Sequence, residues 1–231
     1  MRASTMQYSN IKQARFLWRP NRFIANIELG GQEEIAHVKN TGRCKELLVP
    51  GATIFVQKAD SSSRRTQYDL IAVYKGSRLI NMDSQAPNKV FAEFVRAGNL
   101  FENVTLIKPE TRYKDSRADF YIEADGREII VEVKGVTLEK DGVVLFPDAP
   151  TERGVRHLEG LCEAKAEGYD AYAVFIVQMK DVLYFTPNDE THKAFGDALR
   201  KAASEGVSVL AIDCDITESS ILARDFVEVR L

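Results

Sequence analysis

Apolar and polar residues alternate in short runs over the first third of the chain, a pattern typical of β-strands. Turn-forming pairs, Gly30-Gly31 and Pro50-Gly51, separate some of these runs. The pattern predicts five strands, at 15–18, 23–29, 35–38, 53–57 and 68–74, with a brief helical stretch at 45–48. Five short strands favour a small Greek-key barrel of the oligonucleotide-binding (OB) type, and an SH3-like barrel fits the same pattern.

The periodicity changes from strand-like to helical near Pro87, where apolar residues recur on one helix face until Gly98 ends the pattern. Further helices are expected at 151–167 and 189–205, and strands at 104–107, 117–123, 128–137, 171–178 and 207–212. This αβββαβαβ order predicts a mixed sheet with helices on its faces. We therefore expect two domains, an OB-like barrel over residues 1–85 and an α/β domain over residues 86–231.

The composition is that of a folded globular protein, with 45% hydrophobic and 28% charged residues. No apolar run reaches the ~18 residues that a membrane helix needs, and the first ten residues lack the apolar core of a secretion signal. The three cysteines, Cys44, Cys162 and Cys214, are far apart and have no metal-binding spacing. We expect a cytoplasmic protein with reduced thiols and no membrane partner.

Charge is distributed unevenly between the two predicted domains. Residues 1–85 hold 13 Lys and Arg against 7 Asp and Glu, whereas residues 86–231 hold 18 against 27. The basic first domain suggests a polyanionic partner such as DNA. Trp18 and Phe23 would serve as stacking platforms in a basic groove, or as core residues of the barrel. The candidate phosphate-binding side chains are Arg15, Arg19, Arg22, Lys39, Arg43 and Lys45.

The pair Asp125-Gly126 is a strong hairpin signal between the strands expected at 117–123 and 128–137. A two-residue turn there pairs Ala124 with Arg127. Counting outward from the turn places Asp119 opposite Glu132, and Arg117 opposite Lys134 on the same face of the sheet.

Two opposed carboxylates repel each other, so Asp119 and Glu132 need a compensating cation. A hard divalent ion, Mg²⁺ or Mn²⁺, is suited to such carboxylate ligands. Lys134 would orient a nucleophilic water at the same site, and Glu93 on the preceding helix is a candidate third metal ligand. The alternative is an exposed structural pair that forms salt bridges with Arg117 and Lys134.

The helix expected at 151–167 carries Arg153 and His157 four residues apart, so both lie on one face. Their donors suit phosphate, and a solvated helix face is the alternative reading. His157 has no second histidine at metal-ligand spacing, which argues against zinc. The sequence also lacks a Gly-x-Ser-x-Gly elbow, a Walker loop and a dinucleotide-binding glycine motif.

Three segments carry a resemblance to a known family: NTGRCKELLVPG at 40–51, VEVKGVTL at 131–138 and FPDAPTERGVRHL at 146–158. They closely resemble the sugar fermentation stimulation protein A family, and the likeness extends over nearly the whole chain. It implies an OB barrel followed by a restriction-endonuclease-like PD-(D/E)xK domain. Asp119 matches the Asp of that motif, and Glu132 and Lys134 match its (D/E)xK, while Ala118 replaces its proline.

The resemblance implies a DNA-binding protein, largely without sequence preference, with a regulatory role in sugar (maltose) metabolism and a nuclease-like metal site. An active Mg²⁺-dependent DNA nuclease is the alternative, with Asp119, Glu132 and Lys134 as its catalytic residues. A protein-interaction module with an acidic partner is a third reading. The sequence leaves open whether cleavage occurs, which DNA is bound and which oligomeric state the chain adopts.

Overall fold

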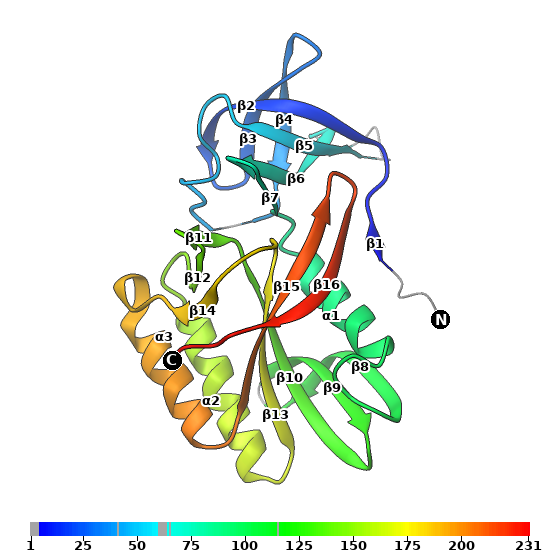
Figure 1. The fold of residues 1–231 in the computed structure, drawn as a ribbon, viewed down its shortest axis with the longest axis vertical. Coiled ribbons are helices and arrows are strands. Elements are labelled where there is room, and N and C mark those ends of the chain that lie inside the picture. The colour runs from blue at the N-terminus through cyan, green and yellow to red at the C-terminus, as the bar shows by residue number, and fades with distance from the viewer. Residues whose placement is uncertain (1–4, 41, 60–63, 65, 115) are drawn as a thin grey trace.

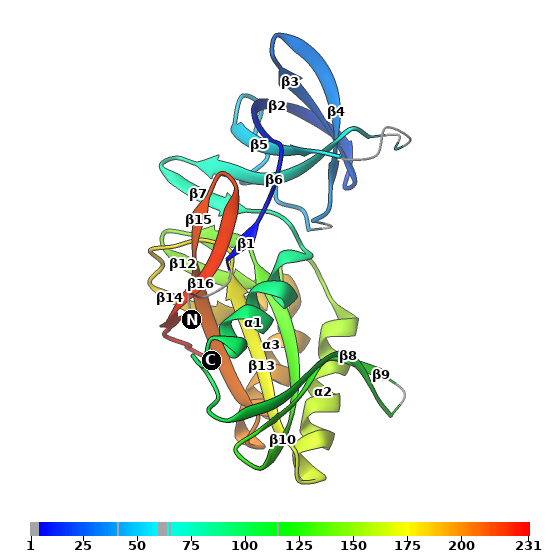
Figure 2. The same cartoon turned by 90° about the vertical axis from the view of Figure 1, so that its right-hand side faces the viewer.

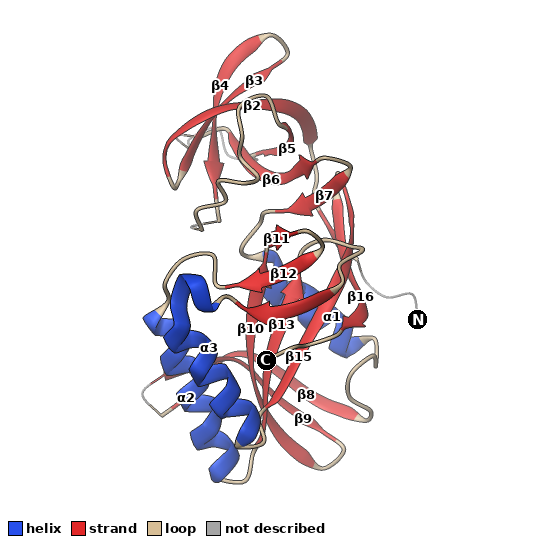
Figure 3. Cartoon of the chain, turned by 60° about the vertical axis from the view of Figure 1, so that its left-hand side comes forward, coloured by secondary structure: helices blue, strands red, loops and turns tan. Residues whose placement is uncertain are grey.

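The structure is a computed structural model that describes residues 5–40, 42–59, 64, 66–114 and 116–231. A strand-only barrel sits at one end of its long axis, and a sheet with helices forms the other end (Figure 1). Colouring by secondary structure shows that two long helices, α2 and α3, lie together on one side of the second part (Figure 3).

The first part is a closed five-stranded barrel. Its strands pair in the order β4-β3-β2-β5-β6, and a parallel pairing between β4 and β6 closes the ring. This closure is that of the predicted OB type, which settles the choice against an SH3-like barrel. A short strand, β7 (Arg78–Asn81), extends the sheet beyond β6. The barrel strands are β2 (Ile11–Asn21), β3 (Ile24–Leu29), β4 (Gln32–Val38), β5 (Thr53–Lys58) and β6 (Tyr68–Lys75).

The helical stretch predicted at 45–48 is wrong, because this segment forms only a hydrogen-bonded turn. The amides of Leu47 and Leu48 both bond the carbonyl of Cys44, at 3.3 and 2.9 Å. Cys44 itself has a φ of 45°, and Val49 precedes Pro50, which disfavours helical backbone at Val49. The turn therefore cannot propagate into a helix.

The second part is built on a seven-stranded mixed sheet in the order β1-β16-β15-β13-β10-β9-β8. Its central strands β10, β13 and β15 run parallel, and the outer pairings are antiparallel. The edge strand β1 precedes the barrel in the chain, yet it pairs with β16. The strands are β1 (Met6–Gln7), β8 (Val104–Tyr113), β9 (Ser116–Ala124), β10 (Arg127–Val136), β13 (Asp170–Val177), β15 (Ser208–Thr217) and β16 (Ser220–Val227).

Three helices cover the sheet close to where the periodicity predicts them: α1 (Ala86–Arg96), α2 (Glu152–Ala166) and α3 (Asp189–Ser204). Alternate residues of the sheet point to opposite faces, and each face packs into its own hydrophobic core. Phe91 of α1 packs with Val131 and Val133 in one core, whereas Leu158 of α2 packs with Ile130 in the other. Figure 2 shows α1 and α2 on opposite sides of β10 and β13. Within the described residues, none of the helices is long and apolar enough to cross a membrane.

Several short strands went unpredicted because they carry too few residues for a periodic signal. Strands β11 (Leu138–Lys140), β12 (Val143–Phe146) and β14 (Tyr184–Pro187) form a small separate sheet. Strand β16 is longer, but its final part, which includes Arg224 and Asp225, is exposed and does not alternate.

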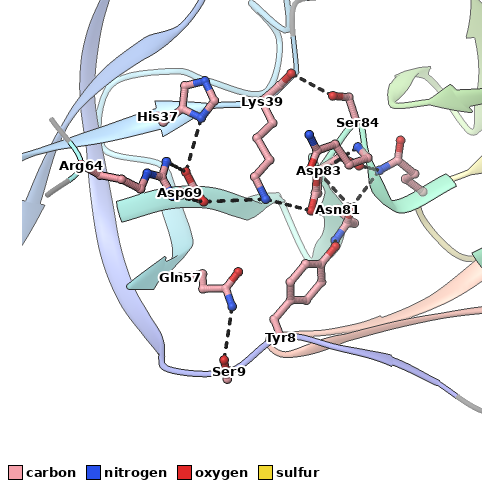
Figure 4. Close-up of polar contacts among 12 residues, drawn as sticks. Tyr8, Ser9, His37, Lys39, Gln57, Arg64, Asp69, Asn81, Asp83 and Ser84 are labelled. Atoms are coloured by element: carbon pink, nitrogen blue, oxygen red, sulfur yellow. Dashed lines mark hydrogen bonds and ion pairs between the residues drawn. The ribbon is translucent and has the colours of Figure 1, made fainter. Parts of the chain in front are cut away.

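A buried polar network joins the barrel to the second part (Figure 4). Gln178 beyond β13 donates from Nε2 to Asn81 Oδ1 at 2.8 Å, and Asn81 Nδ2 donates to the Tyr8 hydroxyl at 3.0 Å. The amide of Gln85 bonds Asp83 Oδ1 at 3.0 Å just before α1. Asn81 and Gln178 are each 1% exposed, so these bonds hold the 81–85 link in one conformation.

The three sequence segments that carry the family resemblance meet at this junction. In the barrel loop, the Cys44 amide bonds Asp148 Oδ2 at 3.0 Å, and Asn40 Nδ2 lies 3.5 Å from Thr137 Oγ1. A Cβ on Gly42 would lie 2.6 Å from the same Asp148 oxygen. Residue 41 of this loop lies outside the described residues. The motif residues therefore dock the barrel onto the second part.

We predict that Gly135→Ala lowers the stability of the protein. A Cβ there would lie 2.4 Å from Gln178 Oε1 and 2.7 Å from Pro87 Cγ, both in the packed junction. The expected loss is about 1–3 kcal/mol, measured by urea denaturation.

Gly160→Ala on α2 is the matched control. A Cβ at Gly160 meets no atom within 4 Å, so this variant should gain up to about 1 kcal/mol from helix propensity. Equal stability changes in the two variants would show that the junction does not depend on the missing side chain.

Candidate metal and nucleic-acid site

The β9–β10 hairpin has the predicted register from Ala124–Arg127 to Phe120–Val131. Beyond Phe120 the regular pairing ends. The Val133 amide donates to the side chain of Asp119, at 2.8 Å from Oδ2. Asn88 Nδ2 of α1 donates to the other oxygen, Oδ1, at 3.0 Å. The Asp119 carboxylate is thus held by a strand on one side and a helix on the other.

The predicted opposition of Arg117 and Lys134 is wrong. At this end the described residues of β9 pair with β8, where Arg117 lies opposite Arg112. The Arg117 guanidinium contacts Glu110 at 3.1 Å and is two-thirds exposed. Because the hairpin strands part after Phe120, the register counted from the turn does not extend this far.

Glu132 lies on the central strand β10, with its side chain only 7% exposed. Its Oε1 accepts from Lys134 Nζ and contacts His157 Nδ1. Arg153 Nε donates to His157 Nε2 at 3.1 Å. Because the Arg153 Nε–H can only donate, Nε2 must accept, so the ring proton sits on Nδ1 and is donated to Glu132. Because Glu132 is buried, the alternative in which Asp119 and Glu132 are an exposed structural pair does not fit this cluster.

The pKa values of the two carboxyl groups are shifted in opposite directions from their ordinary values. Burial raises the pKa of Asp119, and the negative charge of Glu132 raises it further. Burial opposes ionisation of Glu132 as well, but hydrogen bonds from His157 and Lys134 lower its pKa overall. The repulsion felt by Asp119 is a feature that a divalent cation would relieve. Asp119 and Glu132 are therefore the side chains suited to hold a hard metal ion, and Lys134 and His157 contact Glu132.

Glu93 does not join this pair. Burial raises the pKa of its carboxyl group, and the favourable backbone interaction comes from Met6. Its Oε2 is buried with no hydrogen-bond partner among the described residues. Within the same residues, no cluster of three or more His, Cys, Asp or Glu side chains is arranged to hold a metal ion.

The carboxylates lie in a cleft of about 940 Å³. Helix α1 lines one part of this cleft and the start of α2 lines another, with residues of β9 and β10 between them. Arg153 and His157 thus share a cleft with Glu132, as a phosphate-binding role would require. The main polar and charged lining residues are Asn88, Lys89, Glu93, Arg96, Glu110, Asp119, Glu132, Lys134, Arg153 and His157.

The cationic residues predicted in the barrel are in different environments. Arg15, Arg22, Arg43 and Lys45 are exposed. Arg19 donates to the carbonyls of Asn21, Arg22 and Arg43 and so ties two loops together. Lys39 is 16% exposed and forms ion pairs with Asp83 at 3.3 Å and Asp69 at 3.7 Å (Figure 4). Arg19 and Lys39 therefore already have structural partners.

Trp18 and Phe23 are 54% and 45% exposed, so the alternative that they are core residues is wrong. The Arg22 guanidinium lies 5.1 Å from the centre of the Phe23 ring. An exposed aromatic ring beside a cation is the kind of surface on which nucleic-acid bases stack.

Asn88 was missed by sequence reasoning. It positions Asp119 from the first turn of α1, but an asparagine in a first helical turn carries no distinctive pattern. Only the packing of α1 against β9 and β10 reveals its role.

Two family models match the chain. The model described as the SfsA N-terminal OB domain matches residues 17–82. The model described as the sugar fermentation stimulation protein RE domain matches residues 85–220.

Relatives called sugar fermentation stimulation protein homolog match nearly the full length. The homolog of Desulfitobacterium hafniense (strain Y51) is 62% identical over 226 residues, which cover 98% of this chain and 99% of that protein. The homolog of Clostridium beijerinckii is 58% identical over 226 residues, covering 98% of this chain and 100% of that protein.

The structure of Pyrococcus furiosus SfsA in complex with Ca²⁺ matches with a TM-score of 0.89 at 28% sequence identity, and the match covers 98% of each chain. The likeness thus includes both the barrel and the mixed-sheet domain. With its OB barrel, its RE domain and its full-length relatives, the chain belongs to the sugar fermentation stimulation protein family.

Proposed function

We propose that this protein binds DNA, largely without sequence preference, and holds Mg²⁺ or Mn²⁺ between Asp119 and Glu132. The observation that carries the proposal is the pair of acidic side chains inside a cleft whose walls bear cations. Carboxylates suit a hard divalent ion, and cations on either side suit the phosphates of a nucleic acid.

The metal part of the proposal rests on the charge balance around Asp119. Burial and the charge of Glu132 both disfavour its ionised form, and a bound cation would favour it. The related Pyrococcus furiosus SfsA was determined in complex with Ca²⁺. Mg²⁺ is also a hard, oxygen-preferring ion, so the Ca²⁺ complex of the relative supports a divalent site in this family.

The DNA part rests on the exposed cations and aromatics of the barrel. Arg22 beside Phe23, and the exposed side chains of Arg43 and Lys45, suit contacts to a phosphate backbone without base selection. The relatives carry the name sugar fermentation stimulation protein homolog. From that name we infer that this chain has a regulatory role in sugar metabolism, which it exerts by binding DNA.

Phosphodiester cleavage is the second candidate function. It is favoured by the contact of Lys134 and His157 with the same oxygen of Glu132. A bound metal ion would supply charge neutralisation at the scissile phosphate. Lys134 would orient the attacking water, while Arg153 and His157 would contact the phosphate.

The DNA prediction concerns salt dependence. If Arg43 and Lys45 contact phosphates, replacing both by Ala should weaken binding to unrelated duplexes equally and reduce the log-log salt slope by about 0.9 per lost contact. Fluorescence anisotropy at several salt concentrations measures both effects.

Lys193→Ala is the control for this experiment. Lys193 is 73% exposed and pairs with Asp197 on α3, away from the barrel. A salt-independent affinity would exclude phosphate contacts. Failure to bind any DNA, together with binding to an acidic protein, would favour the interaction-module reading.

The metal prediction concerns thermal stability. Saturating Mg²⁺ should stabilise the wild type, by about 2.7 kcal/mol at 100 times Kd, and should not stabilise Asp119→Asn. In metal-free buffer Asp119→Asn should change stability by no more than about 1 kcal/mol, because relief of repulsion offsets one weakened hydrogen bond.

Glu132→Gln separates a metal site from a structural cluster. It should lose the response to Mg²⁺ and also destabilise the metal-free protein, because Lys134 is left near a neutral partner in a buried setting. Identical Mg²⁺ stabilisation of wild type and both variants would place any bound ion elsewhere.

The cleavage prediction concerns Lys134. If the site hydrolyses DNA, wild type should nick supercoiled plasmid in Mg²⁺ or Mn²⁺, and Lys134→Ala should reduce the rate by about 100-fold or more while retaining most of the DNA affinity. Nicking that survives in Lys134→Ala and Asp119→Asn after repurification would come from a contaminant. Binding without nicking in wild type would leave DNA binding as the function.

A further inference from the structure

A second cleft adjoins the one that holds the carboxylates. It measures about 500 Å³ and lies between α2 and the β8–β9 hairpin. Figure 2 shows these elements side by side, and Lys114 at the end of the hairpin forms an ion pair with Glu163 of α2 at 2.9 Å. Arg153 and His157 line both clefts, so the two adjoin at His157, which contacts Glu132, and at Arg153, which donates to His157.

Cations without partners flank this joined depression. Lys89 and Arg96 of α1 line the first cleft, and Arg156 of α2 lines the second. Within the described residues none of the three forms a hydrogen bond or ion pair, and all are exposed. By contrast, Lys114 is paired with Glu163 and Glu167. These exposed cations therefore lie on both sides of Asp119 and Glu132, where they are free to contact the phosphates of a ligand.

The size of the depression limits its ligand. Volumes of about 940 and 500 Å³ are those of small-molecule pockets, which hold a few nucleotides of a single strand. The floor of the first cleft is also recessed, because the side chains of Glu132 and His157 are only 7% and 13% exposed. A phosphate in a duplex carries the paired strand with it, whereas a lone strand can bend into the cleft.

We propose that the joined clefts form one continuous track for single-stranded DNA, which runs from α1 past Asp119 and Glu132 to the groove between α2 and the β8–β9 hairpin. Lys89 and Arg96 contact phosphates on one side of the carboxylates, and Arg156 contacts a phosphate on the other. This inference rests on the proposed function and names its preferred substrate.

The barrel supplies a separate observation in favour of a single strand. Trp18 and Phe23 expose about half of their surface, and an exposed ring stacks on bases only where the bases are unpaired. The barrel meets the track at the 81–85 link, where the Ser84 hydroxyl bonds the carbonyl of Lys39 at 2.8 Å and Ser84 itself lines the first cleft.

The test is an anisotropy titration of the full chain in metal-free buffer, with a fluorescent single strand and with the same sequence as a duplex. Wild type should bind the single strand about tenfold more tightly. The double variant Lys89→Ala, Arg96→Ala and the single variant Arg156→Ala should each weaken single-strand binding about threefold to tenfold. Each lost contact should reduce the salt slope by about 0.7.

Lys193→Ala and Lys201→Ala are the controls, since both lysines lie on α3, line neither cleft and already have acidic partners. Both should bind like wild type, and the melting temperatures of all variants should agree. Single-strand binding that is unchanged in the α1 and α2 variants would overturn the track and leave DNA binding intact. Equal loss of duplex and single-strand affinity would replace the single strand by a duplex. Absence of any DNA binding by wild type would overturn the proposed function itself.

Discussion

The hydrogen bond from the Val133 amide to the Asp119 carboxylate is the contact on which the candidate site depends. In a regular ladder that amide would face a main-chain carbonyl of the neighbouring strand. Here the side chain of Asp119 satisfies it at 2.8 Å, and regular β9–β10 pairing stops at Phe120. The exchange keeps a buried donor bonded while it opens the sheet. It also places the Asp119 carboxylate beside Glu132. Burial is the larger cause of the raised pKa of Asp119, and the charge of Glu132 raises it further.

The barrel contributes to that geometry from a distance. Gln178 bonds Asn81 and the carbonyl of Asp83, and Asp83 in turn accepts the amide of Gln85 at the start of α1. Asn88, one turn further along, donates to Asp119. The buried junction between the two parts therefore sets where α1 begins, and through it the position of a group that holds the acidic side chain. Gly135 is part of the same junction because any side chain there would meet Gln178.

The two parts of the molecule present cations differently. On the barrel, Arg22, Arg43 and Lys45 are exposed, while Lys39 and Arg19 are occupied by structural partners. In the second part Lys89, Arg96 and Arg156 line the clefts around the recessed pair Asp119 and Glu132. Exposed basic side chains suit non-selective contact with a phosphate backbone, and a recessed acidic pair suits a metal ion and a single phosphate.

The sequence determined the features that depend on local spacing. The Asp125-Gly126 turn set the hairpin register as far as Phe120, and Pro87 marked the start of α1. Arg153 and His157 were placed on one face by their four-residue spacing. Tertiary structure decided which side chain of α1 reaches Asp119. Asn88 donates to it, whereas Glu93 lines the same cleft but bonds the backbone of Met6. Lys39 and Asp83 are 44 residues apart, and a pair so distant forms only when the chain has folded. Spacing along a strand or helix fixes directions locally, but long-range contacts decide which donors and acceptors remain available to a ligand.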